Sequence, residues 1–578
     1  MHCSNCHVIL GLLQALPPAQ DKLLPCSVSS RIVSATFPVF RPNQRPQWLA
    51  KFVARDGGPN GSAVGQTSNA AHPCGRYPTG TSARMSNDNP QALSVMEKIG
   101  YSLGDLAANL IFQTLVSFLA FFYTDVYRIP AETAATVIFA VGLLGAFVFT
   151  PVMGLVADRT HTRWGKFRPW LLWTAVPFGV FALLAFSTPN FGEHGKVAYA
   201  LASYTLLMGI YIANNLPYSA LSGVLTGNMD QRNSLSSYRF VAVMIAQFII
   251  QVLLLPLVLI LGHGDKAKGF EHVMALFAVV GTVFFLITFF TTRERVVSTA
   301  AQGYSIRQDL TDLAANRPWQ IMLTLTVLVF VTLALKGGMY VYYFKYYLDG
   351  DDLARFLENI GFNHFIAGLN ALLVSVGLTG FQWPKDAPTS AFSLFSAGGI
   401  ICMIIGIGFS RRLAERYGKR DVFGGALLLS TVCLLAFALY SPQSVGLVIL
   451  SYMLHGFFYG ITTPLLWAMV ADVADYSEWK NHRRATAIVF SAILCGLKAG
   501  LSIGGALVAQ ILSTYGYAPE QAVQSAATVH GIKLAVSVYC SIPFLLGVAL
   551  LFLYKIDKRA ETHIEQELAA RRVQAAAA

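Results

Sequence analysis

Residues 270–292 read FEHVMALFAVVGTVFFLITFFTT, a run whose only charged residue is Glu271. A run of roughly 20 apolar residues crosses the hydrocarbon core of a bilayer as a helix, because backbone amides there find partners only within the segment. Similar runs follow one another from Tyr101 to Tyr554. They predict an all-α membrane protein with twelve transmembrane helices, at residues 101–126, 132–157, 170–187, 197–224, 237–262, 270–292, 319–347, 388–410, 422–440, 445–471, 486–514 and 532–554.

The composition fits this class of protein. The chain is 54% hydrophobic and 12% charged, whereas soluble proteins have roughly 25% charged residues. The formal net charge is +12, but the basic residues gather in short connections between the apolar runs, which is typical of cytoplasmic loops rather than of a nucleic-acid site. We therefore expect the bilayer and no nucleic acid as a partner. Four cysteines inside apolar runs are interpreted as small hydrophobic residues, with no disulfide framework: Cys402, Cys433, Cys495 and Cys540.

The sequence divides into segments of different composition. Residues 1–94 are rich in Pro, Gly, Ser and Asn without periodicity and are expected to be a disordered extension. Met85 or Met96 is an alternative start, which would make residues 1–84 upstream sequence. The predicted order is then a six-helix bundle at 95–292, a cytoplasmic linker at 293–318, a second six-helix bundle at 319–556 with an outer-side insertion at 348–388, and a cytoplasmic tail at 557–578.

Basic residues follow the even-numbered apolar runs and are scarce after the odd-numbered ones, which places both termini in the cytoplasm. The loop after the second run also resembles the loop after the eighth. The matching motifs are Arg159-x3-Arg163-Trp164-Gly165-Lys166 and Arg412-x3-Arg416-Tyr417-Gly418-Lys419. Two matched halves of six helices are typical of a duplicated transporter.

One segment breaks this symmetry. Leu348–Pro388 has no counterpart in the first half, and its middle, Phe356–Leu378, is moderately apolar. We expect this segment to lie on or near the outer face of the membrane, with a re-entrant segment as the alternative.

Charged side chains inside the apolar runs are candidate functional residues, because each costs roughly 2.5–3.5 kcal/mol at the bilayer centre. Lys498 in the eleventh run and Lys336 in the seventh are candidates for a water-filled cavity, and a structural ion pair is the alternative for Lys498. Lys345 is expected to extend to the outer surface. Asp105 is either a helix-start acid or a proton carrier. His455 could titrate near neutral pH or be simply hydrogen-bonded.

Uncharged polar residues gather in the first and fourth runs. Amides can bind the hydroxyls of a neutral ligand, and aromatic rings can cover its apolar faces. Hydrogen bonding between helices is the alternative. The predicted substrate-binding residues are Asn109, Gln113, Tyr211, Asn215, Lys336 and Lys498, with Asp105 and His455 as coupling candidates.

The chain carries no phosphate-binding GxxxxGK[ST] loop, no HExxH motif and no nucleophile elbow with triad partners. We therefore expect no enzyme activity and no cofactor.

Several motifs distributed along the chain are specific in combination. They are Gly104-Asp105, Phe122-Tyr123-Thr124-Asp125-Val126, Pro151-Val152-Met153-Gly154, Asp158-Arg159, Arg163-Trp164-Gly165-Lys166-Phe167-Arg168-Pro169-Trp170, Asn215-Leu216-Pro217-Tyr218, Ser237-Tyr238-Arg239-Phe240 and Ala471-Asp472-Val473-Ala474-Asp475-Tyr476-Ser477-Glu478-Trp479-Lys480. With them, residues of about 97–556 resemble the glycoside–pentoside–hexuronide:cation symporters, close to the melibiose and xyloside carriers.

This resemblance implies a major facilitator superfamily fold and transport of a sugar or glycoside by alternating access across the bacterial inner membrane, with the monomer as the functional unit. Lys498 matches the helix-11 lysine of the melibiose-type members, and Arg239 matches their helix-5 arginine. Asn109 and Asn215 stand where those members carry aspartates of helices 1 and 4, and Tyr211 matches a nearby tyrosine.

The sequence departs from the family in the second helix. Members that couple to sodium carry two aspartates one turn apart there, and this chain has Ala146 and Thr150 instead. Sodium needs oxygen ligands and compensating negative charge, so we expect no metal site and no sodium coupling. Proton coupling through Asp105 or His455 is the main hypothesis, and uncoupled facilitated transport is the alternative.

Charged residues near the cytoplasmic ends predict a gate between the two halves. Its candidate residues are Asp158, Arg159, Arg163, Arg239, Arg412, Arg416, Asp472, Asp475 and Glu478. Two other functions keep the same fold: a lysolipid-type carrier, which would need apolar lateral cavities, and a non-transporting sugar sensor.

Overall fold

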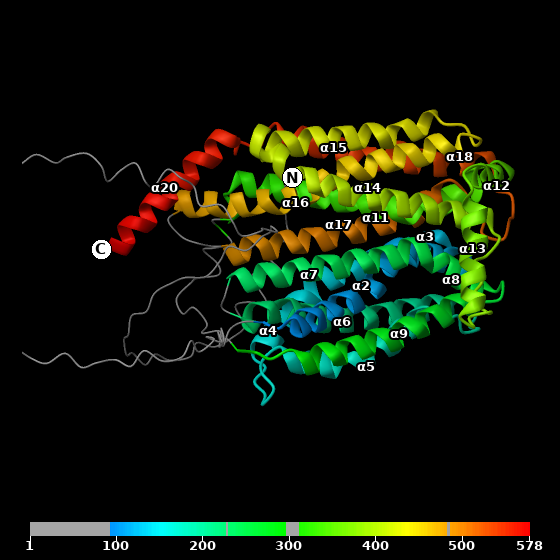
Figure 1. Cartoon of the computed structure of the whole chain (residues 1–578), viewed down its shortest axis with the longest axis horizontal. Coiled ribbons are helices and arrows are strands. Elements are labelled where there is room, and N and C mark those ends of the chain that lie inside the picture. The colour runs from blue at the N-terminus through cyan, green and yellow to red at the C-terminus, as the bar shows by residue number, and fades with distance from the viewer. Residues whose placement is uncertain (1–92, 227–228, 296–310, 312, 482–485, 578) are drawn as a thin grey trace, which may run out of the picture. The chain divides into compact units, whose positions relative to one another are not determined.

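The computed structural model describes residues 93–226, 229–295, 311, 313–481 and 486–577 (Figure 1). The predicted extension at 1–94 therefore lies almost entirely outside the described residues, and so do residues 296–310 and 312 of the predicted linker at 293–318. Within the described ranges the chain forms twelve helices long and apolar enough to cross a membrane, and no strand. The predicted all-α class with twelve spans is confirmed. We number the spans 1 to 12 in chain order.

Spans 1 to 6 form the first half. They comprise α2 (Val95–Phe121), α3 (Ala131–Leu144) with α4 (Thr150–Asp158), α5 (Arg168–Ala185), α6 (Glu193–Leu225), α7 (Met229–Phe248) with α8 (Leu254–Leu261), and α9 (Lys266–Thr291). Spans 7 to 12 form the second half. They comprise α11 (Arg317–Tyr342), α14 (Ala387–Tyr417), α15 (Lys419–Leu435), α16 (Val445–Asn481), α17 (Thr486–Thr514), and α18 (Ala526–Leu534) with α19 (Cys540–Leu551).

Five spans contain a π-helical turn, which places an extra residue in the helix and is often found at functional sites. These turns are Phe122–Val126, Gly145–Phe149, Ile249–Leu253, Tyr343–Tyr347 and Ala535–Tyr539. The first and the fourth end spans 1 and 7, which occupy equivalent places in the two halves.

Several helices extend beyond the predicted apolar runs. Span 1 begins at Val95 rather than residue 101, because Ser94 and Glu97 form a capping box that satisfies the first free amides. Span 10 continues through Asn481 rather than ending at residue 471. Hydropathy marks only the part of a helix that lies in hydrocarbon, so polar helix ends in water are missed.

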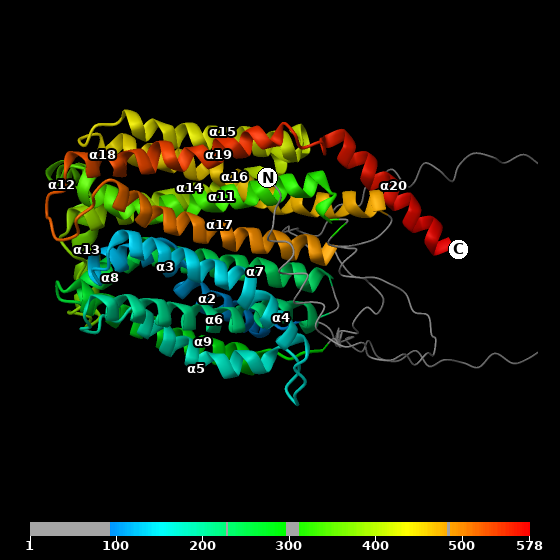
Figure 2. The same ribbon diagram turned by 180° about the vertical axis from the view of Figure 1, so that it is seen from behind.

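The long segment between spans 7 and 8 forms two helices, α12 (Gly350–Asn359) and α13 (Phe362–Ser375). Leu353 and Leu357 are buried and anchor α12, whereas α13 has no buried residue. The 14 residues of α13 are fewer than the roughly 20 that a span needs. Figures 1 and 2 show α13 running across the ends of the spans, opposite the end where α20 (Lys558–Ala577) lies. We call the α20 end the terminal side and the other end the far side.

Glycines allow the helices within the second half to pack at close range. Gly496, Gly500 and Gly504 recur every four residues on α17 and face α11. A Cβ atom at Gly500 would lie 2.6 Å from the carbonyl oxygen of Val327. Because lipid tails are as apolar as the helices, such small-residue contacts supply much of the packing between spans.

The two halves meet along equivalent pairs of spans. Span 2 packs against span 11, span 5 against span 8, and span 1 against span 7. The surface between the halves is therefore where a shared site would form.

The glycine stripe on α17 generates a first prediction. Gly500→Ala is expected to lower the stability of the protein by about 1–3 kcal/mol, because the added methyl group presses on the backbone of Val327. Gly408→Ala on α14 is the matched control, since a Cβ there meets nothing within 4 Å. Thermal unfolding in detergent measures the difference, and equal midpoints for the two variants would contradict the predicted packing.

Candidate functional site

A cavity of about 270 Å³ lies between the two halves, close to the lower limit of the range of roughly 300–1,000 Å³ for small-molecule sites. Its walls come from spans 1, 5, 7, 8, 10 and 11. The polar lining residues are Gln113, Ser117, Gln247, Gln251, Lys336, Tyr340, Ser396, Tyr452, His455 and Tyr459. We call this space the central cavity.

The walls of the central cavity therefore combine amide, hydroxyl and amine groups with aromatic rings. Tyr340 is 3% exposed, and its hydroxyl has no hydrogen-bond partner within the described part of the chain. A buried hydroxyl without a partner costs roughly 1–3 kcal/mol, so a ligand that hydrogen-bonds it would gain affinity. This combination suits a molecule with many hydroxyls.

Lys336 and His455 meet on the second-half wall of the central cavity. The Lys336 Nζ atom lies 2.5 Å from Nε2 of His455. On the other side of the ring, His455 Nδ1 lies 2.8 Å from Oγ of Ser430. Lys336 and His455 are 8% and 1% exposed, so the contact is shielded from bulk water.

A second, smaller cavity of about 50 Å³ contains Lys498. Phe112, Val116 and Leu501 line both cavities, so the two adjoin. The Lys498 ammonium donates to the hydroxyl of Thr150 at 3.0 Å, and that hydroxyl donates to the carbonyl of Gly145 at 2.8 Å. Lys498 therefore joins span 11 to span 2 at their middle.

Tyr211 also lines the smaller cavity. It is 7% exposed, and its ring stacks on Phe112 with centroids 5.1 Å apart. An aromatic wall therefore faces the Lys498 amine.

Asp105 belongs to a separate network within the first half. Arg239 Nε donates to the Asp105 carboxylate at 2.9 Å, and the Asn109 amide donates to the same carboxylate at 3.2 Å. The Arg239 guanidinium lies over the rings of Tyr101 and Tyr218, 5.6 and 5.3 Å from their centroids. Removing one partner of such a buried pair costs roughly 3–5 kcal/mol because the other charge is left uncompensated, so Asp105 and Arg239 depend on each other across spans 1 and 5.

The predicted substrate-binding residues therefore fall into three groups. Gln113 and Lys336 line the central cavity, and Tyr211 and Lys498 line the smaller one. Asn109 bonds Asp105, and neither it nor Asn215 lines either cavity. Sugar binding by any of these residues stays a prediction.

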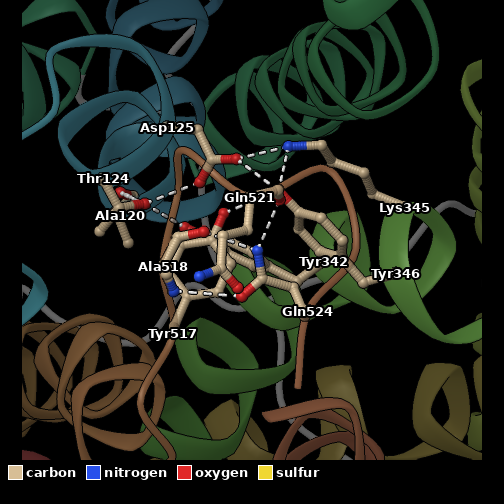
Figure 3. Close-up of polar contacts among 10 residues, drawn as sticks. All are labelled: Ala120, Thr124, Asp125, Tyr342, Lys345, Tyr346, Tyr517, Ala518, Gln521 and Gln524. Carbon is tan, nitrogen blue, oxygen red and sulfur yellow. Dashed lines mark hydrogen bonds and ion pairs between the residues drawn. The ribbon is translucent and has the colours of Figure 1, made fainter. Parts of the chain in front are cut away.

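Polar contacts join spans 1 and 7 at the far side of the protein. Figure 3 shows that the Lys345 ammonium points at the Asp125 carboxylate, 2.6 Å away, and joins span 7 to span 1. Thr124 and Tyr342 share a hydrogen bond of 2.7 Å between the same spans. We call the residues Thr124, Asp125, Tyr342, Lys345 and Tyr346 the far-side latch. Lys345 was expected to extend to the outer surface; its side chain lies at the far-side end of span 7, 32% exposed, and pairs with the buried Asp125 carboxylate, a partner that the sequence did not predict.

The loop before span 12 extends the latch. Tyr517 and Tyr346 share a hydrogen bond of 2.9 Å between their hydroxyls. Burial and the neighbouring Asp125 raise the pKa of Tyr517 above its usual range, so its hydroxyl stays protonated at physiological pH. Gln524 folds this loop by bonding the backbone of Ala518 in both directions, at 3.1 and 2.6 Å (Figure 3).

On the terminal side, the described ion pairs of the predicted gate residues lie within one half. Asp472 pairs with Lys419 at 2.6 Å, and Lys419 also pairs with Glu561 of α20 at 2.8 Å. Arg412 and Arg416 are exposed, and Arg416 lies over the ring of Tyr417.

The other gate candidates give less information. Arg159 and Arg163 are exposed, with Arg163 over the ring of Trp164. Asp475 and Glu478 are half-buried on α16, and the side chain of Asp158 lies outside the described residues. A gate between the halves on this side stays a prediction for another conformation.

In the first half, Glu294, which follows span 6, contacts the start of α5. Its carboxylate accepts from the backbone amides of Lys166, Phe167 and Arg168 at 2.9, 2.7 and 2.8 Å. A carboxylate at the start of α5 satisfies amides that the helix leaves free.

Sequence reasoning missed four residues that matter in these contacts: Asp125, Gln247, Gln251 and Tyr340. Two signals could have identified Asp125. It is an acid within an apolar run, and it lies at the end of span 1, which is equivalent to the end of span 7. Gln247 and Gln251 stand four residues apart on span 5, a spacing that places them on one face.

Comparison with known proteins places these features in a family. The family model described as "MFS/sugar transport protein" matches residues 100–378 and 387–558. The inner membrane symporter YicJ of Escherichia coli is 34% identical over 458 residues, covering 79% of this chain and 91% of that protein. The isoprimeverose transporter of Lactiplantibacillus pentosus is 34% identical over 475 residues, covering 80% and 89%. The glucuronide carrier protein homolog of Escherichia coli is 29% identical over 474 residues, covering 81% and 94%.

Solved structures agree at the level of the fold. A bacterial homologue of the human lysosomal transporter Spinster matches with a TM-score of 0.51 and 12% identity, over 81% of this chain and 97% of that chain. The nucleoside transporter NupG, as a mutant, matches with a TM-score of 0.50 and 14% identity, over 78% and 99%.

The far-side latch generates the second prediction. Lys345→Met is expected to raise the rate at which a membrane-impermeant maleimide, added on the far side, labels a cysteine placed at Ser117 in the central cavity. The lost charged hydrogen bond is worth roughly 1.5–3 kcal/mol, which shifts a two-state population roughly ten- to hundredfold. The labelling is measured in a background without other reactive cysteines.

Arg128→Met is the matched control for this experiment. Arg128 and Glu520 form an ion pair of 3.8 Å on the same side, but both side chains are largely exposed, and exposed pairs contribute little. Equal labelling of the Lys345→Met variant and this control would show that the latch does not hold the far side closed.

Proposed function

The chain belongs to the MFS/sugar transport protein family, and from this membership we propose that it moves a sugar or glycoside across the membrane by alternating access, coupled to a proton. The observation that carries the proposal is the central cavity, which lies between the two halves and combines amides, hydroxyls and an amine with aromatic rings. A xyloside or related pentoside is the proposed cargo, since a transporter named for isoprimeverose is among the relatives.

The contacts of Thr150 favour a proton over sodium as the coupling ion. Ala146 offers no oxygen ligand from its side chain, and the hydroxyl of Thr150 is bonded by Lys498. A sodium ion at this place would lie beside an ammonium group without a carboxylate to offset the repulsion.

Of the two proposed proton carriers, His455 fits the geometry better than Asp105. Asp105 is compensated by Arg239 outside both cavities. His455 lines the central cavity and touches Lys336. A proton that binds His455 changes the charge of the wall that faces the sugar.

We propose that the terminal side faces the cytoplasm of a bacterial inner membrane, because basic residues gather there in the loops after spans 2 and 8. The far-side latch would then close the outer entrance, so the structure corresponds to a state closed toward the outside. Transport would require the latch to open and the terminal side to close.

An acidic sugar is the second candidate cargo. The observation that favours it is the presence of Lys336 and His455 on the central cavity, whose described lining residues include no carboxylate. The glucuronide carrier homolog among the relatives supports the same class. A carboxylate on the sugar would pair directly with Lys336.

Uptake into proteoliposomes tests the proposed function. We expect accumulation of at least one labelled xyloside, galactoside or hexuronide, abolished by a proton uncoupler and unaffected by replacing sodium with potassium. Strong stimulation by a sodium gradient would refute the assignment of the coupling ion, and uptake that ignores both gradients would indicate facilitated transport.

Tyr340 offers a sharper test of the binding site. Tyr340→Phe is expected to weaken sugar binding roughly two- to tenfold, because it removes one hydrogen bond worth about 0.5–1.5 kcal/mol. Tyr343→Phe is the matched control, since the hydroxyl of Tyr343 is also buried with no partner among the described residues, but Tyr343 does not line the central cavity. Affinity measured by titration calorimetry should separate the two variants, and equal affinities would remove Tyr340 from the site.

A further inference from the structure

The contact between Lys336 and His455 joins two bases in the interior of the second half. Lys336 lies on α11 and His455 on α16, with 2.5 Å between Nζ and Nε2. Two positive charges at this distance would repel strongly, because no described carboxylate faces them. The contact is therefore unfavourable when both side chains are protonated.

The contacts of Ser430 fix the state of the imidazole ring. His455 Nδ1 lies 3.1 Å from the backbone carbonyl oxygen of Ser430. Oγ of Ser430 lies 2.8 Å from the same Nδ1 atom and can donate or accept, whereas a carbonyl oxygen only accepts, so both contacts are satisfied together when Nδ1 carries the hydrogen. The Nε2 atom then has a free lone pair, which accepts a hydrogen bond from the Lys336 ammonium.

The surroundings of the pair suit one excess positive charge. The titratable groups that face it are Tyr340 on α11, Tyr452 and Tyr459 on α16, and Cys540 on α19. The Lys336 Nζ atom lies 4.9 Å from the ring centroid of Tyr459 and 6.0 Å from that of Tyr452. Aromatic faces attract one cation, but they do not offset two cations in contact.

We propose that Lys336 and His455 form a single proton-binding site, in which the two bases share one excess proton, and that this proton is the coupling ion. The proposal rests on the proposed function of sugar transport. The proton passes from water on one side of the membrane to the Lys336–His455 pair, and from the pair to water on the other side. No carboxylate takes part.

Both members of the pair line the central cavity, so proton and sugar binding are linked there. A charged ammonium donates stronger hydrogen bonds to sugar hydroxyls than a neutral amine does. Proton binding thus strengthens sugar binding, and by reciprocity a bound sugar retains the proton. Loss of the proton on the opposite side of the membrane weakens the hold on the sugar and favours its release.

Two transport assays on the same proteoliposomes test the proposal. Exchange of labelled for unlabelled sugar at equal pH needs no net proton movement, whereas uphill uptake under an imposed pH gradient does. With one proton per sugar, a gradient of one pH unit supports up to about tenfold accumulation. The wild-type chain is expected to perform both.

His455→Gln and Lys336→Gln are the test variants. Each is expected to exchange sugar at a reduced rate but to lose uphill accumulation, so that the internal sugar concentration only reaches the external one. Each should also lose the uptake of protons that sugar addition causes in detergent solution, recorded with a pH-indicator dye. His194→Gln is the matched control, because His194 is exposed at the start of α6 and lies outside both cavities.

The outcomes separate the two proposals. Uphill accumulation of the wild-type size in both test variants would overturn the proton-binding site. A wild-type chain that exchanges sugar but ignores the pH gradient would overturn it as well, while leaving sugar transport in place. A wild-type chain that exchanges no xyloside, galactoside or hexuronide would overturn the proposed function together with the site. If one variant fails to fold, the other still decides.

Discussion

The structure depends on one constraint: hydrocarbon offers no hydrogen bonds to a polypeptide backbone. The described spans are helical along their length, and the irregular turns inside them stay helical as π or 3-10 turns. Because lipid tails are as apolar as the helices, burying apolar surface does not drive the helices together. They associate through close van der Waals packing instead. The glycines of α17 let the backbone of α11 approach, and Gly456 and Gly399 do the same for spans 10 and 8.

The same constraint sorts the charged residues into two kinds. Arg239 and Lys345 each meet a buried carboxylate, Asp105 and Asp125, and these pairs hold helices together. Lys336 and Lys498 meet an imidazole and a hydroxyl instead. The two carboxylate pairs lie away from the central cavity, whereas Lys336 lines it and Lys498 lines the space beside it.

The sequence was sufficient for the number and the nature of the spans, because length and hydropathy report directly on the bilayer. It was also sufficient to single out Lys336 and His455, since charged or titratable groups are rare in apolar runs. It could not pair them, because the contact joins residues more than a hundred positions apart and depends on how spans 7 and 10 face each other. The partner of Lys345 was missed for the same reason: Asp125 lies on span 1, and only the packing of the halves brings the two side chains together.

The described residues that line the central cavity include no acid, whereas the far-side latch contains the carboxylate of Asp125. Asp125 and Lys345 stand on π turns that end spans 1 and 7, at equivalent places in the two halves. A contact between equivalent ends changes strongly when the halves rotate against each other, whereas contacts within one half, such as Lys336 with His455, move as a unit. The contact between the halves and the contact within one half therefore respond differently to this rotation. In the proposed mechanism, the carboxylate pair between the halves breaks and re-forms as the halves move, whereas the pair of bases stays intact within one half and carries the proton across the membrane.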